Sequence, residues 1–127
     1  EQYASATGLV RLAKRYFEKN TKNSILTGKE ITAKEVFDAA KAGDAAALEI
    51  TEEFGAYLGQ ALVNLAATVD PAVFVIGGGV SKAGDILLET VRKYFYDHAF
   101  YGNQKTKITL ATLGNDAGIY GAAKQVL

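Results

Sequence analysis

Apolar side chains recur at helical spacing through the first third of the chain. One such run extends from about Ser5 to Asn20, and the polar stretch 21–31, which contains a glycine, predicts a surface loop after it. Thr32 and Glu35 have the spacing of a capping box, which predicts a second helix that Gly43 ends.

A long third helix is predicted to follow directly. Asp44 is a favourable N-cap residue, and the helix should end at Asp70-Pro71, because the residue before a proline avoids the helical region. The spacing gives this helix one apolar inner face, made of Leu48, Phe54 or Gly55, Leu58, Leu62, Leu65 and Val69.

The pattern changes after Pro71. Four consecutive β-favouring residues, Val73–Ile76, predict a strand that is buried on both faces, and they run into three glycines and Val80. Helical spacing then returns in a segment that ends at about His98. Apolar and polar residues alternate over Lys107–Thr112, which predicts a second, more exposed strand.

The chain closes with a turn, Leu113–Asp116, and a helix of small residues, Ala117–Val126. Gly118 and Gly121 weaken that helix, so we expect them to pack closely against another element. The predicted class is α/β, rich in helix and with two strands. Because two strands do not make a self-sufficient sheet, the missing strands are expected from outside this segment.

Composition narrows the functional classes. The 127 residues suit one domain, and 14 basic residues balance 14 acidic ones, so neither a nucleic-acid nor a membrane partner is indicated. The chain has no cysteine, which excludes disulfides and thiolate metal sites within it and agrees with a cytoplasmic location. It also has no methionine, even at position 1, which predicts a piece of a longer protein.

The most informative candidate site is the glycine run 77–79. It follows a predicted strand, at the end where ligands bind in open α/β sheets, and it would let a ligand lie against backbone N–H groups. A tight turn that needs glycine only for its dihedral angles is the competing explanation, but three glycines in succession favour a nucleotide-type ligand. Lys82 replaces the third glycine of a dinucleotide fingerprint, and no P-loop follows. His98, the single histidine, suits the end of its helix better than catalysis.

Four segments, in order and with family-like spacing, resemble the bacterial ROK sugar kinases, and the ATP-dependent glucokinases most closely. They are Glu1–Gly8, Asp70-Pro71, Val75–Ser81 and Leu113–Ala123. The resemblance implies an actin-like, ribonuclease-H-like ATPase fold of two lobes, in which residues 1–127 form the C-terminal part of the larger lobe. Kinases of the family transfer the γ-phosphoryl of ATP, bound with Mg²⁺, to a sugar hydroxyl, which for glucokinases is the 6-hydroxyl of glucose.

The resemblance also implies roles for individual residues. Glu1 matches a family glutamate that accepts hydrogen bonds from sugar hydroxyls. The family's adenosine-binding segment is matched by Gly77, Gly78, Gly79 and Val80.

Groups that the family needs for catalysis are expected outside this segment. The resemblance implies that the catalytic aspartate, both phosphate loops and the ligands of a structural zinc lie upstream, so no catalytic or metal-binding residue is assigned here. Asp116 is expected to cap the final helix, and Ser81 is favoured as the cap of the helix after it rather than as a nucleotide contact. The complete protein is expected to be a homo-oligomer, either a dimer or a tetramer.

Two alternatives to a kinase remain. ROK proteins include sugar-responsive transcriptional repressors, which carry the same domain behind an N-terminal helix-turn-helix. A non-catalytic oligomerisation segment is the weaker alternative. The glycine run and the closing segment favour the kinase, and the residues upstream of Glu1 would distinguish a catalytic aspartate with a phosphate loop from a helix-turn-helix.

Overall fold

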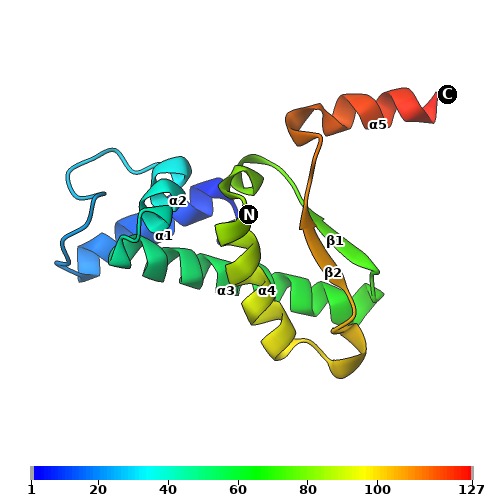
Figure 1. The fold of residues 1–127 in the computed structure, drawn as a ribbon, viewed down its shortest axis with the longest axis horizontal. Coiled ribbons are helices and arrows are strands. Elements are labelled where there is room, and N and C mark those ends of the chain that lie inside the picture. The colour runs from blue at the N-terminus through cyan, green and yellow to red at the C-terminus, as the bar shows by residue number, and fades with distance from the viewer. Residues whose placement is uncertain (1, 127) are drawn as a thin grey trace.

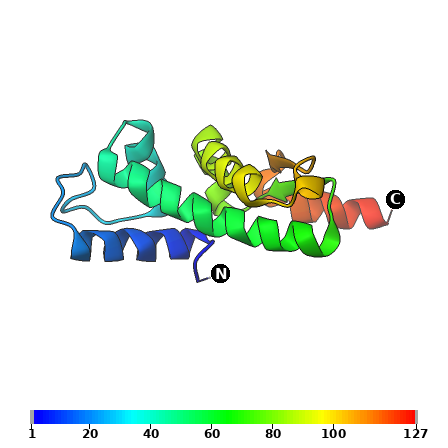
Figure 2. The same ribbon diagram turned by 90° about the horizontal axis from the view of Figure 1, so that it is seen from below.

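One long helix organises the fold. The computed structural model describes residues 2–126, with the backbone only at Asn115. Helix α3 (Ala45–Val69) runs through most of the molecule; α1 (Ala6–Lys19) and α2 (Ala33–Lys41) pack on its first half, and α4 (Asp85–His98) crosses it (Figures 1 and 2). Within residues 2–126, no helix combines the length and the apolarity that crossing a membrane requires. The remaining elements are strands β1 (Val73–Ile76) and β2 (Lys107–Leu110), helix α5 (Ala117–Gln125) and the short 3-10 helices Gly79–Ala83, Tyr101–Asn103 and Gly114–Asp116.

Local hydrogen bonds start the helices where the sequence predicts. The N–H of Glu35 donates to the Thr32 hydroxyl at 3.2 Å, and the Thr32 N–H donates to the Glu35 carboxylate at 3.0 Å, which confirms the capping box. The carboxylate of Asp44 accepts a hydrogen bond from the Ala47 N–H at 2.9 Å and so begins α3. Gly43, with a φ of +84°, follows the end of α2.

The buried stripe of α3 differs from the predicted inner face. Phe54 and Leu62 are buried as expected, and the helix ends at the predicted place, before Asp70. The prediction of one continuous apolar face is nevertheless wrong, because α3 contacts α1 and α2 on one part of its surface and α4 on another. Three of the predicted positions are exposed: Leu48, Leu65 and Val69, at 40%, 50% and 64%.

Two buried glycines of α3 allow α4 to cross it at close range. A Cβ atom at Gly55 would lie 2.6 Å from the Cβ of Thr90, and one at Gly59 would lie 2.9 Å from the Cβ of Tyr94. Any larger residue would push the two helices apart. The close crossing of α3 and α4 therefore depends on glycine, with no side chain, at positions 55 and 59. The spacing of apolar residues does not reveal this requirement.

Only one face of the two-stranded sheet is covered. On that face the Phe74 ring meets the Phe95 ring of α4 edge-on, with 6.0 Å between centroids, and Ile108 is buried. On the other face Val73 and Val75 are 45% and 60% exposed. The predicted burial of β1 on both faces is thus wrong within residues 2–126, because α4 lies on one side and no described element packs on the other.

The two edges of the sheet differ. The strands pair in parallel, and the Lys107 N–H donates toward β1, so the carbonyl of Ile108 points away from it. Arg92 donates two hydrogen bonds to that carbonyl, from Nε at 3.2 Å and from Nη2 at 2.6 Å. On the free edge of β1, no described group pairs with the backbone of Val73 or Val75. A further strand can therefore add at β1, whereas at β2 it would displace Arg92.

Helix α5 stands apart from the other helices beyond the strands (Figure 1), and none of its residues is buried. A Cβ atom at Gly118 or Gly121 would meet no atom within 4 Å in the described part of the chain. The close packing predicted for these glycines has no partner within residues 2–126.

Candidate functional site

The segments that follow the two strands begin side by side at the carboxyl edge of the sheet, because the strands are parallel. Strand β1 runs into Gly77–Val80, and β2 runs into residues 111–116 (Figure 1). The Ala111 N–H donates to the carbonyl of Ile76 at 2.8 Å, and a Cβ atom at Gly77 would lie 3.6 Å from the Ala111 Cβ. Two motifs that are distant in the sequence therefore line one edge, where ligands bind in open α/β sheets.

The glycines of the turn differ in whether backbone conformation or packing requires them. Gly78 has φ of +76° and ψ of −167°, a region that is essentially restricted to glycine. Gly79 has no such φ, and a Cβ atom placed on it would meet nothing within 4 Å. All three glycines are exposed. The turn therefore requires Gly78, but neither backbone geometry nor packing requires Gly79.

The residues after the glycines anchor the turn. Val80 belongs to the hydrophobic core and is only 9% exposed, so it anchors the turn to the core. Ser81 does not cap α4, so that prediction is wrong: a 3-10 helix intervenes, and Gly84 occupies the N-cap position. Instead the Ser81 hydroxyl donates to the carbonyl of Gly78 at 2.7 Å. Sequence reasoning missed this bond across the turn.

Asp116, at the second turn, also departs from its predicted role. It precedes α5, but its side chain makes no capping hydrogen bond, because the chain enters α5 through a 3-10 turn with Asp116 already in the helical region. Within residues 2–126, no group of three or more His, Cys, Asp or Glu side chains is placed to hold a metal ion.

The predicted sugar ligand, Glu1, lies outside the described residues. The residues that follow it, Gln2 and Tyr3, contact α1 and α3. They form one wall of a cavity of about 120 Å³ against α1 and α3, lined by Gln2, Tyr3, Gly8, Arg11, Leu12, Arg15 and Tyr57.

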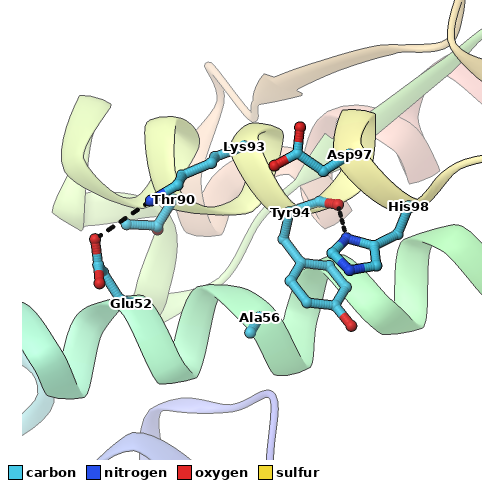
Figure 3. A pocket seen from close by; sticks show the side chains of 7 residues that line it. All are labelled: Glu52, Ala56, Thr90, Lys93, Tyr94, Asp97 and His98. Carbon is cyan, nitrogen blue, oxygen red and sulfur yellow. Dashed lines mark hydrogen bonds and ion pairs between the residues drawn. The ribbon is translucent and has the colours of Figure 1, made fainter.

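A separate groove of about 260 Å³ lies between α3 and α4 (Figure 3). The Lys93 Nζ lies 3.6 Å from the Glu52 Oε1, and the Tyr94 and His98 rings stack with their centroids 3.9 Å apart. His98 stands at the C-terminal end of α4, as predicted, with its Nδ1 2.8 Å from the Tyr94 carbonyl. The helix of His98 thus engages one of its ring nitrogens.

Comparison with known proteins places this geometry in a family. The model of the ROK family matches residues 1–127. The chain belongs to the ROK family. It is 41% identical over 126 residues to a glucokinase of Halalkalibacterium halodurans. The aligned region covers 95% of this chain and 38% of that protein. This match confirms the resemblance to ROK sugar kinases.

Solved ROK structures confirm the predicted fold class. A ROK family glucokinase from Streptomyces griseus, solved in complex with glucose and AMPPNP, is 35% identical with a TM-score of 0.86, over 98% of this chain and 43% of that one. A ROK family transcriptional regulator, a homologue of the E. coli MLC protein, is 24% identical with a TM-score of 0.71, over 86% of this chain and 28% of that one. At this identity the likeness shows a shared fold and nothing more. The chain thus spans less than half the length of these relatives and has the α/β fold of part of an actin-like ATPase lobe.

Proposed function

We propose that the complete protein is a hexose kinase that transfers the γ-phosphoryl of Mg-ATP to the 6-hydroxyl of glucose. Residues 1–127 are the C-terminal part of its larger lobe and supply the adenosine-binding turn. The observation that carries this proposal is Gly79, an exposed glycine that neither its φ nor a neighbour requires. A nucleotide that lies against the backbone at this position would require that no side chain be present there. Similarity to glucokinases supports the choice of donor and acceptor.

In this proposal the chain binds and positions both substrates but does not activate the sugar hydroxyl. The backbone of Gly77–Val80 contacts adenosine, and Ser81 holds the turn through the Gly78 carbonyl. Glu1 accepts hydrogen bonds from two sugar hydroxyls, and an analogue without them leaves its carboxylate unpaired.

Phosphoryl transfer also needs charge neutralisation and a proton acceptor, because positioning alone leaves the charge on the phosphoryl oxygens uncompensated. Mg²⁺ would supply that neutralisation. Its ligands, the catalytic aspartate and the structural zinc site are proposed to lie upstream of residue 1. The complete protein is further proposed to be a cytoplasmic homodimer or homotetramer, which light scattering tests for the oligomeric state.

The direct test is turnover of glucose and Mg-ATP by the complete protein. We expect stoichiometric ADP and glucose 6-phosphate, with the phosphorylated position assigned by ³¹P NMR, and no turnover by residues 1–127 alone. Turnover by the isolated segment would show that the assigned division of the active site is wrong. Absence of turnover by the complete protein, together with sequence-specific DNA binding, would replace the kinase by a transcriptional regulator, the alternative that shares the fold.

A further inference from the structure

The segment that follows Glu1 folds back onto α1 at a single glycine. A Cβ atom at Gly8 would lie 2.6 Å from the carbonyl oxygen of Tyr3 and 2.8 Å from that of Gln2, both of them backbone atoms. Such distances are below any normal contact, so an alanine at position 8 would force the segment away from the helix. The N–H of Gly8 also donates to the Ser5 hydroxyl at 3.0 Å, which fixes the start of α1.

Nothing else in the helix explains Gly8. Its φ is not positive, and a glycine inside a helix costs about 1 kcal/mol relative to alanine. The close approach of two backbone carbonyls is therefore the structural reason for this residue. In this respect Gly8 differs from Gly78, which its backbone conformation requires.

A second contact ties the same segment to α3. The Tyr3 ring lies against the Tyr57 ring, with centroids 5.4 Å apart and planes inclined by 39°. The Tyr57 hydroxyl donates to the carboxylate of Glu53 at 3.2 Å, one turn earlier on α3, which orients the ring. The backbone of Gln2 and Tyr3 thus lies close against α1 at Gly8, and the Tyr3 ring packs on α3 at Tyr57.

We infer that Gly8 and Tyr57 are positioning residues for hexose binding. Gly8 lets the backbone of Gln2 and Tyr3 lie against α1, and Tyr57 packs on the Tyr3 ring. Glu1 directly precedes Gln2 in the chain, and neither Gly8 nor Tyr57 lies in the nucleotide turn. The inference rests on the proposed role of Glu1 as a sugar ligand. Because a displacement of about 1 Å in a positioning group can cost on the order of 100-fold in rate, we expect a backbone shift of that size at Tyr3 to impair use of the sugar.

The test measures glucose and ATP kinetics for Gly8→Ala in the complete protein. We expect the KM for glucose to rise at least about tenfold while the KM for ATP stays within about twofold, because only the sugar-binding segment moves. Gly55→Ala is the matched control: it adds the same methyl group to a helical glycine with an equally short contact, 2.6 Å to Thr90, on the part of α3 that faces α4. It should lower thermal stability and leave the KM for glucose unchanged.

Two further variants keep the inference separable from the proposed function. Tyr57→Leu removes the ring contact without adding volume, and we expect a smaller rise in the KM for glucose; this variant decides the outcome if Gly8→Ala yields no soluble protein. Glu1→Gln tests the proposed role itself. If Glu1→Gln raises the KM for glucose but neither Gly8→Ala nor Tyr57→Leu does, the positioning inference is overturned and the proposed role stands. If Glu1→Gln has no effect, both are overturned.

Discussion

Replacement of Gly79 separates a nucleotide contact from a requirement of the fold. Gly79 has no positive φ, and its Cβ position faces open space, so Gly79→Val should change the free energy of unfolding by no more than about 0.5 kcal/mol. If adenosine lies against this backbone, the added side chain occupies its place. The Kd for AMPPNP should then rise at least tenfold, which corresponds to about 1.4 kcal/mol, and the Kd for glucose should not change.

Gly78→Ala should behave differently, because its φ of +76° and ψ of −167° exclude a side chain on geometric grounds. The strain should destabilise the protein by about 1–3 kcal/mol and weaken both ligands together. Gly102→Val is the matched control: Gly102 is also exposed, lies in a 3-10 helix and has no neighbour within 4 Å, but it precedes β2 instead of following a strand.

Isothermal titration calorimetry with AMPPNP and with glucose, combined with urea unfolding of each variant, measures these effects in the complete protein. Gly102→Val should match the wild type in all three quantities. A folded Gly79→Val variant that binds AMPPNP with wild-type affinity would refute the nucleotide contact. Glycine at this position would then have no ligand-based explanation.

Two further predictions concern the scaffold. Asp44 accepts hydrogen bonds from the Ser24 hydroxyl (3.0 Å) and from the N–H groups of Ile25 (2.8 Å) and Ala47 (2.9 Å); partial burial acts to raise its pKa, but these bonds together lower it below the usual 3.8. The stabilisation that the Asp44 carboxylate gives the fold is therefore present above pH 3.8 and lost as the pH falls through the lowered pKa. Asp44→Asn should lower the free energy of unfolding by about 1–2 kcal/mol near pH 7 and reduce the loss of stability in acid, as measured by urea unfolding across pH. An unchanged pH profile would contradict this. Arg92→Met removes both hydrogen bonds to the Ile108 carbonyl, so it should lower the free energy of unfolding by about 1 kcal/mol and increase self-association, as measured by sedimentation velocity. A stable, monodisperse variant would show that Arg92 does not protect the edge of β2.

Local chemistry explains which parts of the fold could be predicted. The capping box of Thr32 and Glu35 and the N-cap of Asp44 depend on atoms within three residues, so the sequence contains all the necessary information. The exposure of Leu48 and the burial of Gly59 depend instead on where α4 crosses α3. That crossing is a tertiary contact between segments that are distant in the sequence.

The candidate site shows the same division. The position of Gly77–Val80 after a strand identifies it from sequence, but its proximity to Ala111 requires the parallel pairing of β1 and β2. In the sequence, Gly8 cannot be told from any other glycine that weakens a helix. Only the structure shows the carbonyl of Tyr3 beside it. The exposed face of β1 and the isolated α5 have no packing partner within residues 2–126, so no pattern in these residues could specify one.

The central claim is that the glycine turn contacts the nucleotide, and amide hydrogen exchange tests it most directly. The N–H groups of Gly77 and Gly78 donate to no other backbone group within residues 2–126, so they should exchange rapidly in the free protein. Rapid-mixing hydrogen–deuterium exchange of the complete protein, with and without AMPPNP, should show slowed exchange over Gly77–Val80, and glucose alone should not produce this protection. Unchanged exchange at these amides under saturating AMPPNP, with protection elsewhere, would contradict the claim.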